Sequence, residues 1–445
     1  MKKNRINKML LALCLITGIG VKAQKVNEFS VKQTVDYGLK NSVIVKNALI
    51  NIKKQKQTNR EITAAAFPQL NAGVNFTDYL DIPTSLIPAE FFGGPAGTYQ
   101  PVQFGTKYNA GGSVDISQIL FDGQVFVGLQ ARSAAMEMAT KIKEVTEEQI
   151  KANIYKIYYQ LVVGKQQMTS IDANIERYTK LSNDTKEIFK NGLAEKLDVD
   201  KLQVALNNLL TEKEKTQNQL DAGNAGLKYL IGMPQKEILV LTDSLDENEI
   251  KTNLLDTNYK YEDRKEIQLL NVVSKLNQYN VKRYQLSRIP TLSAFGNYTK
   301  NAQRQKFDFF DKKGDWFTTS LIGVKMNIPI FDGFARRARI ENAKLDLEKV
   351  NNSIDSSKQM IDNDVVNARI KMKSAMLTMD SQKKNIELAE KVFNTTKKKY
   401  DQGLGSNQEI SNAQSELKIA QNNYYNALYD AITAKVDWLK AIGKL

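Results

Sequence analysis

The sequence predicts a mainly α-helical chain made of two tandem copies of one unit, each ordered helix, strand, strand and long helical hairpin. Three motifs recur in the same order along the chain. They are Phe121-Asp122-Gly123 with Phe331-Asp332-Gly333, Gly-Leu at 192–193 and 403–404, and Ile231-Gly232 with Ile442-Gly443. The offsets between the copies are 210, 211 and 211 residues. Such constant spacing indicates an internal duplication.

The N-terminus has the pattern of a secretory signal peptide. Basic residues within 2–8 precede an apolar run at 9–19, and Ala23 is a small residue at a suitable cleavage position. The run is too short to span a bilayer as a helix. We expect residues 1–23 to be removed. A lipoprotein signal ending at Cys14 is the alternative, although the apolar run continues past that cysteine.

Composition limits the chemistry of the exported chain. The sequence has no His, and cleavage after Ala23 removes its only Cys with five Lys or Arg. The remaining 58 basic and 49 acidic residues give a formal charge of +9. Without imidazole or thiol, the chain lacks Cys–His and Ser–His nucleophiles and most zinc sites. The basic excess fits solvated helix faces, and we expect no nucleic acid partner, because no compact basic motif stands out.

A proline marks the change from helical to strand periodicity in each copy. Pro68 and Pro290 end the preceding helices, because proline disfavours helical backbone in the residue before it. Apolar and polar residues then alternate, which predicts strands at about 68–80, 106–120, 290–300 and 316–330. One apolar face and one face of Asn, Ser, Gly and Lys suit a transmembrane barrel with a wet interior. An ordinary soluble hairpin with one buried face would show the same alternation.

Long helical hairpins are predicted at 122–232 and 332–443. Asp122 and Asp332 stand where helix N-caps belong, and we prefer that role to a chemical one. Apolar residues repeat every seven residues in all four arms, as in a coiled coil. The first arm, 123–190, would be roughly 100 Å long and needs partners along its length.

These elements predict three segments after the signal peptide. Residues 24–235 form the first repeat and residues 259–445 form the second. The acidic, patternless segment 236–258 is expected to be a linker.

The order of signal peptide, helix, two strands and hairpin, given twice, resembles the outer membrane efflux protein family typified by TolC. The resemblance rests on the two Phe-Asp-Gly junctions, the two strands that start at proline and the two Gly-Leu tips, and it covers essentially the whole mature chain. It implies a homotrimer whose protomers each give four strands to a 12-stranded β-barrel in outer-membrane lipid. A periplasmic α-helical coiled-coil barrel would continue the channel toward a periplasmic adaptor (membrane fusion) protein and an inner-membrane pump.

The resemblance also implies roles for particular residues. In the family the hairpin tips contact the adaptor, and the matching residues here are Gly192, Leu193, Gly403 and Leu404. A simple turn with a left-handed glycine would account for the same motif. Both interpretations can hold together.

Family members often place acids six and nine positions after the second tip glycine, at the periplasmic constriction. Those positions here are Glu409 and Asn412, so the second acid is missing. A ring of three Glu409 carboxylates would attract cations. Asp198, six residues after the first tip glycine, could join a closing network with Lys or Arg. A favourable contact with the helix dipole is the simpler explanation for an acid there.

We therefore expect a passive outer-membrane exit channel of a tripartite efflux or type I secretion machine, with no catalytic residue, cofactor or metal. A soluble periplasmic coiled-coil scaffold or adaptor is the alternative. An exported enzyme working through Asp/Glu pairs has little support, because the acids are scattered. The second hairpin has Ala413 and Ala420 where the first has Leu202 and Leu209, so we expect it to pack more closely and to move on opening.

Overall fold

The computed structural model describes residues 26–245, 250–251, 259–311 and 314–445. The predicted signal peptide and its cleavage site, and most of 246–258, lie outside the described residues. The chain forms two compact units. Unit 1 comprises the chain up to Asn51, Thr140–Leu269 and Ile354–Leu445, and unit 2 comprises Ile52–Ala139 and Leu270–Ser353.

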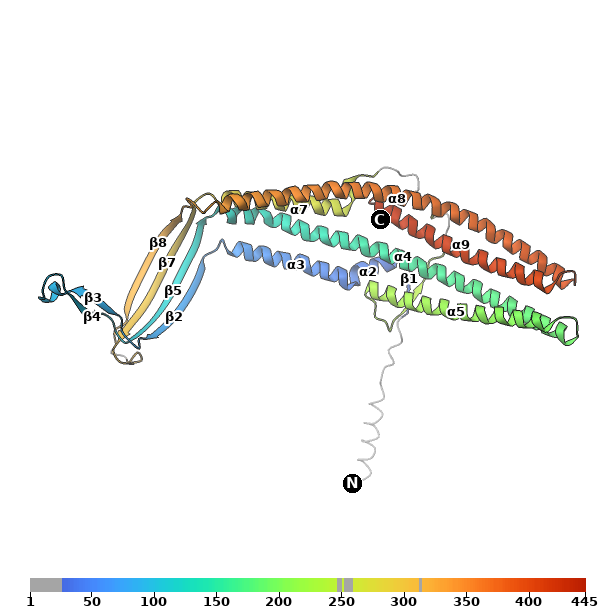
Figure 1. Cartoon of the computed structure of the whole chain (residues 1–445), viewed down its shortest axis with the longest axis horizontal. Coiled ribbons are helices and arrows are strands. Elements are labelled where there is room, and N and C mark those ends of the chain that lie inside the picture. The colour runs from blue at the N-terminus through green and yellow to red at the C-terminus, as the bar shows by residue number, and fades with distance from the viewer. Residues whose placement is uncertain (1–25, 246–249, 252–258, 312–313) are drawn as a thin grey trace, which may run out of the picture. The chain divides into compact units, whose positions relative to one another are not determined.

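The element order confirms the predicted repetition of helix, strands and helical hairpin (Figure 1). The helices are α2 (Val31–Asn41), α3 (Val43–Ala64), α4 (Gly123–Lys190), α5 (Lys196–Ile231), α7 (Lys265–Leu286), α8 (Ala335–Asp401) and α9 (Asn407–Ala441), with 3-10 turns η1 (Ala89–Phe92) and η2 (Tyr261–Asp263). The strands are β1 (Val26–Phe29), β2 (Gln69–Asp78), β3 (Thr84–Pro88), β4 (Tyr99–Gln103), β5 (Tyr108–Phe121), β6 (Ile238–Leu241), β7 (Thr291–Arg304) and β8 (Phe317–Asn327). None of the described helices is long and apolar enough to cross a membrane.

Unit 2 contains a four-stranded antiparallel sheet in the order β2-β5-β7-β8 (Figure 1). Directly paired residues share a face, so the pairs Leu70↔Ile116 and Gly296↔Ile322 place the apolar residues of all four strands together. Ile322 is 93% exposed on that face. On the opposite face Asn297 Nδ2 donates to Asp115 Oδ1 at 2.7 Å. The predicted alternation is therefore present across the sheet.

The loop between β2 and β5 contains a further hairpin that the sequence did not predict. Strands β3 and β4 pair antiparallel from Thr84↔Gln103 to Pro88↔Tyr99. Pro88 and Pro101 interrupt the alternation on which strand prediction depends, and a two-stranded ribbon tolerates proline because its outer edges need no hydrogen-bonding partner. The prolines in this segment are therefore the reason that the β3–β4 hairpin was not predicted.

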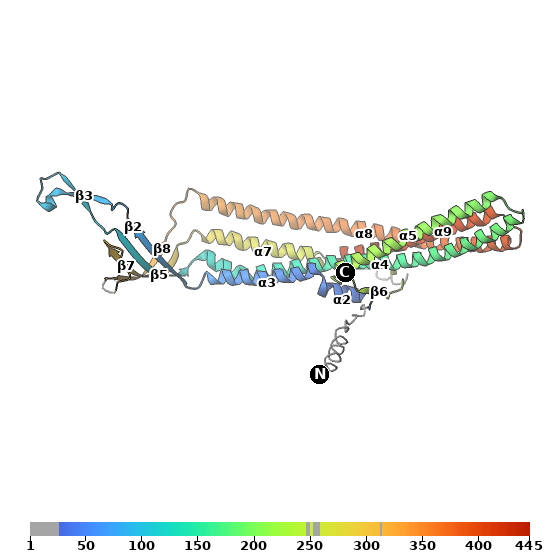
Figure 2. The same ribbon diagram turned by 90° about the horizontal axis from the view of Figure 1, so that it is seen from below.

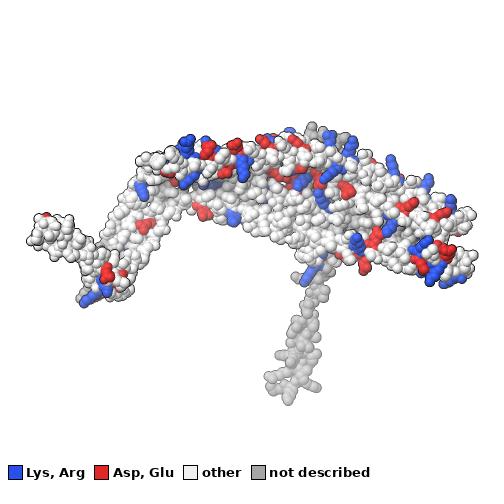
Figure 3. Space-filling view, viewed as in Figure 1, with Lys and Arg blue, Asp and Glu red and all other residues white. Residues whose placement is uncertain are grey.

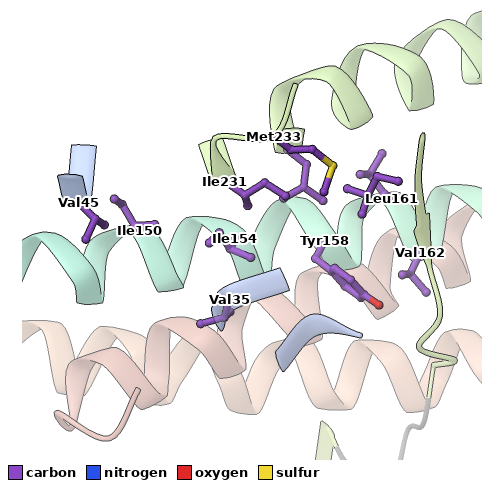
Figure 4. Close-up of a cluster of buried hydrophobic side chains, with 11 residues drawn as sticks. Val35, Val45, Ile150, Ile154, Tyr158, Leu161, Val162, Ile231 and Met233 are labelled. Atoms are coloured by element: carbon purple, nitrogen blue, oxygen red, sulfur yellow. The ribbon is translucent and has the colours of Figure 1, made fainter. Parts of the chain in front are cut away.

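Unit 1 is organised around the paired arms of the two helical hairpins. The α4 arm lies beside α5 and the α8 arm beside α9 in both views (Figures 1 and 2). Heptad positions of α4 supply the core, since Ile154 is fully buried and Leu161 is 7% exposed. They pack with Val35, Tyr158 and Ile231 from α2, α4 and α5 (Figure 4). The coiled-coil periodicity read from the sequence thus identifies buried residues correctly.

The segment 236–258, which we expected to be a patternless linker, contains strand β6. This strand pairs in parallel with β1, from Val26↔Ile238 to Phe29↔Leu241. The paired residues are 212 positions apart, close to the offset of the repeat. Four-residue strands are too short for alternation to be recognised in a sequence, which explains the error.

A buried arginine holds the C-terminal end of α9 within unit 1. Arg264 is 4% exposed, and its Nη1 donates to the Ala441 carbonyl at 3.0 Å. Beside it, the hydroxyls of Tyr259 and Tyr261 donate to Asp362 on α8 at 2.6 and 2.9 Å. The hydrogen bond to Asp362 raises the pKa of Tyr259 to about 12. These contacts anchor the start of α7 to α8 and α9.

Candidate functional site

The two hairpin tips have the same backbone geometry. Gly192 and Gly403 have φ angles of +76° and +72°, which favour glycine. Leu193 N donates to Ile188 O at 3.1 Å, and Leu404 N donates to Lys399 O at 2.9 Å. Each tip is therefore a Schellman-type helix end, in which the residue after the glycine closes the last turn.

The tip leucines do not pack into their own hairpins. Leu193 is 81% exposed and Leu404 is 76% exposed. In a Schellman motif the residue after the glycine often contacts the last helical turn, and these leucines leave most of their surface in solvent. Two exposed apolar side chains at matching places give the tips surface that a partner protein could cover.

The two hairpins contact each other through a shared apolar cluster close to the tips. It joins both arms of both hairpins and consists of Tyr178, Leu181, Leu202, Leu209, Phe393, Ile410, Ala413 and Leu417. Nearer the tips, Lys201 Nζ on α5 donates to Gln408 Oε1 on α9 at 3.5 Å. A lateral contact between the hairpins thus lies beside the predicted constriction residues.

The predicted constriction residues lie in the first turns of α5 and α9. Glu409 and Asn412 are exposed on α9, and Asp198 is half-buried on α5. Asn412 Oδ1 accepts from Gln408 Nε2 at 2.8 Å, which links Asn412 to Lys201 through Gln408. Sequence reasoning missed Gln408, although its position one turn before Asn412 could have indicated it. Among the described residues, no Lys or Arg forms an ion pair with Asp198.

The two Phe-Asp-Gly junctions in unit 2 connect β5 to α4 and β8 to α8. Asp122 Oδ1 accepts from Gln124 N at 2.7 Å, and Asp332 Oδ2 accepts from Arg336 N at 2.9 Å. Asp122 directly precedes α4 and caps it as the sequence predicts. Asp332 lies three residues before the start of α8, outside the N-cap position, and accepts from the amide of its second residue. Asp332 also lies 3.6 Å from Arg336 Nε.

The two junction glycines serve different purposes. A Cβ on Gly123 would lie 2.8 Å from Leu286 Cβ, so glycine there permits close packing. Gly333 has open space around it but a φ of +64°, and Phe334 after it has a φ of +67°. Phe121 lies near Phe126 of α4, with a ring-centroid distance of 5.6 Å. Phe331 lies 5.5 Å from Phe334, the residue directly before α8.

Within the described residues, no group of three or more His, Cys, Asp and Glu side chains could hold a metal ion. The candidate site consists instead of exposed tips, a lateral hairpin contact and exposed polar residues.

Residues 264–444 match the family described as "Outer membrane efflux protein". The match covers 181 of the 445 residues. Members form trimeric channels that span the outer membrane and extend into the periplasm, and they are not enzymes. The protein is accordingly a non-enzymatic outer-membrane efflux channel.

Individual relatives are distant in sequence. Protein CyaE of Bordetella pertussis is 21% identical over 341 residues, covering 75% of this chain and 70% of CyaE. Alkaline protease secretion protein AprF of Pseudomonas aeruginosa is 19% identical over 328 residues, covering 72% of this chain and 67% of AprF. The crystal structure of VceC from Vibrio cholerae has the same fold, with a TM-score of 0.70, 14% identity and coverage of 93% and 96% of the two chains.

Proposed function

We propose that the protein is the homotrimeric exit duct of a tripartite efflux or type I secretion machine, passive itself and driven by an inner-membrane pump. A periplasmic adaptor would connect the two, and the cargo would be small molecules or proteins. AprF is named for protease secretion, which is why proteins belong among the cargo classes.

The observation that carries this proposal is the sheet of unit 2. Its edge strands, β2 and β8, have no partner strand among the described residues. Its apolar face is highly exposed near both edges, with Val74 at 92% and Ile322 at 93%. Free strand edges invite pairing with other chains, and an exposed apolar face requires lipid or protein cover. Pairing of β2 with β8 of the next protomer would close a barrel with lipid outside and the polar face inside.

The hairpin tips are proposed to receive the adaptor. Gly192 and Gly403 fix the two turns, and Leu193 and Leu404 offer apolar side chains that an adaptor would bury. Near the tips, three Glu409 side chains would form the acidic ring of the constriction, and Asn412 would weaken its preference for cations. Asp198 is proposed to face that network as a second, smaller negative contribution.

Membrane integration and conductance test the proposal. We expect heat-modifiable trimers that leave membranes only with detergent, and small cation-preferring pores in planar bilayers. Val74→Arg should impair integration by roughly 2–4 kcal/mol, because it places a charge in the lipid-facing band. Asn75→Arg is the matched control on the polar face and should integrate normally.

A chain that is fully soluble without detergent and forms no pores would instead favour the soluble periplasmic scaffold. Equal integration of the Val74→Arg and Asn75→Arg variants would contradict the proposed orientation of the sheet.

A further inference from the structure

One lysine interrupts the apolar face of the unit 2 sheet. Lys300 lies on β7, in register with Gly112 on β5 and Thr318 on β8, and it is exposed. Paired residues share a face, as do alternate residues of one strand. Lys300 therefore projects from the same side of the sheet as Tyr298 and Ile322. We call this side the outer face, because the proposed barrel turns it toward lipid.

No acid on the described strands neutralises Lys300. The other charged residues on the outer face of the four strands are Asp78 and Arg304. These two lie in one row with Tyr108 between them, and Arg304 also forms an ion pair with Asp308 at 3.4 Å. Within the part of the chain that the structure describes, the Lys300 side chain forms no ion pair or hydrogen bond. Its charge is therefore open to a partner outside the protomer.

Lys300 lies toward the end of the sheet that is farther from the helices. β5 and β8 lead into α4 and α8 at one end, whereas Lys300 is four residues from the opposite end of β7 (Figure 1). Because the helices extend into the periplasm, the opposite end belongs to the outer leaflet of the membrane.

Aromatic rings and charges mark the same end of the sheet. Phe76 and Tyr108 stack with a ring-centroid distance of 6.2 Å, and Phe307 packs edge-on against both rings. Such aromatic girdles flank the lipid-facing band of membrane barrels. Figure 3 shows few charged side chains over the side of the sheet in view, and a group of them at this loop end. Lys300 thus lies near the level of lipid head groups.

A shallow hollow of about 510 Å³ lies on the outer face beside Lys300. Its lining includes Ile116, Gly296, Tyr298 and Ile322. Tyr298 is the next residue to Lys300 on this face, so the hollow leads from the apolar middle of the sheet toward the ammonium group. The paired Gly112 leaves further room, because a Cβ there would meet only the Gly73 carbonyl oxygen, at 4.0 Å. The surface therefore offers both an apolar recess and an accessible cation.

We propose that Lys300 and this hollow form a binding site for lipid A, the phosphorylated lipid of lipopolysaccharide. The inference rests on the proposed function, because it requires the barrel and its orientation in the membrane. The Lys300 ammonium group contacts a lipid A phosphate, and one acyl chain lies in the hollow beside Tyr298. A lysine in the lipid-facing band of a barrel is destabilising, and a charge-assisted contact with an anionic head group offsets that penalty.

The position of Lys300 favours lipid A over a phospholipid. Phospholipids occupy mainly the periplasmic leaflet of the outer membrane, which meets the other end of the sheet. Lipopolysaccharide occupies the outer leaflet, where Lys300 lies. The site therefore serves one leaflet.

Binding of purified lipid A to the delipidated, detergent-solubilised trimer tests this proposal, with native mass spectrometry as the readout. The first test variant is K300Q. The second is T318E, which keeps Lys300 but gives it a carboxylate in register on the neighbouring strand. The matched control is K325Q, because Lys325 is exposed on β8 but lies on the opposite, polar face.

We expect K300Q and T318E to bind lipid A about tenfold more weakly, as the loss of one charge-assisted contact predicts. K325Q should change the affinity by less than about twofold. The exchange K300T/T318K should recover most of the binding, because it returns a lysine to the same row and face. Lipid A without its phosphates should bind the wild type about as weakly as lipid A binds K300Q. T318E replaces K300Q if that variant forms no trimer.

Unchanged binding to K300Q, or equal losses in K300Q and K325Q, overturn the lipid site but leave the channel proposal standing. Displacement of lipid A by millimolar inorganic phosphate overturns the role of the hollow. Equally tight binding of phosphatidylglycerol, with the same sensitivity to K300Q, overturns the assignment to lipid A. Trimer formation and pore conductance are measured separately, so a wild-type chain that forms neither contradicts the proposed function, and the lipid site with it.

Discussion

The two hairpin tips share one backbone and differ in their side chains. Gly192 and Gly403 close equivalent turns with nearly equal φ angles, and the leucines after them are similarly exposed. The charges of the tips differ. Residues 180–201 around the first tip contain five Lys and five Asp or Glu, whereas residues 391–412 around the second contain four Lys and two Asp or Glu. Capping differs too, since Ser406 Oγ accepts from Glu409 N at 3.1 Å, whereas Glu195 makes no side-chain cap. Duplication has preserved what the turn requires and left the exposed surface free to diverge.

Equivalent positions of the two copies therefore need separate tests. A pore built from both hairpins has tip surfaces of two kinds, which differ in charge and in helix capping. The two hairpins can therefore differ in function. The second hairpin is the one that we expect to move on opening. Variants that treat the hairpins unequally are therefore the most informative.

Locking the hairpins together should have the largest effect. The mature chain is expected to contain no cysteine, so Lys201→Cys with Gln408→Cys introduces the only thiols of the exported protein. Their native side chains meet at 3.5 Å across the two hairpins. A short, reversible thiol crosslinker there should abolish export while leaving the trimer intact, and reduction should restore export.

The matched control for this crosslink joins the two arms of the first hairpin. Lys186 Nζ and Gln203 Oε1 are 3.4 Å apart on its two arms, so the same crosslinker between cysteines at these positions joins elements that should not separate. Export should continue in that variant. Full export from the locked Lys201–Gln408 variant would rule out relative movement of the two hairpins.

Substituting alanine for either junction glycine should have a smaller effect. Gly123→Ala should destabilise the trimer by about 1–3 kcal/mol, because the new methyl meets Leu286. Gly333→Ala should cost about 1–2 kcal/mol through its left-handed backbone alone. The trimer-to-monomer transition temperature on heating measures both.

Asparagine substitutions distinguish the steric clash at Gly123 from the backbone strain at Gly333. It tolerates left-handed backbone, so Gly333→Asn should be milder than Gly333→Ala. It is larger than alanine, so Gly123→Asn should be worse than Gly123→Ala. The opposite order at either junction would show that the assigned cause is wrong.

Measurements of ion selectivity show how much each residue of the proposed constriction contributes to the cation preference of the pore. Glu409→Gln should reduce the cation preference of the pore by about two- to tenfold, because it removes one charge from each protomer at the proposed ring. Asn412→Asp should raise it, and Asp198→Asn should change it least. Reversal potentials in a KCl gradient measure these shifts. An anion-preferring wild-type pore would eliminate the Glu409 proposal.

The fold was largely predictable because its signals are long or repeated. Heptads place Ile154 and Leu161 in the core, and alternation places Val74 and Ile322 on one face of the sheet. Short or interrupted elements were missed, as with β6 and the β3–β4 hairpin, because four or five residues give too little periodicity. At the candidate site, the turns followed from Gly-Leu, but the contact of Lys201 with Gln408 depends on packing between hairpins that are distant in sequence.

The smallest expected effect tests the capping difference between the tips. Ser406→Ala removes the hydrogen bond from Glu409 N, and loss of a serine N-cap costs about 1 kcal/mol. Glu195→Ala should change stability by only a few tenths of a kcal/mol, because Glu195 makes no side-chain cap. Hydrogen exchange at Asn407–Ile410 should accelerate about fivefold in the first variant, as a change of 1 kcal/mol in local opening predicts. Faster exchange without any change in global stability would mean that the second tip already opens locally, as its expected movement requires. Equal exchange in the two variants would show that the capping difference does not distinguish the tips.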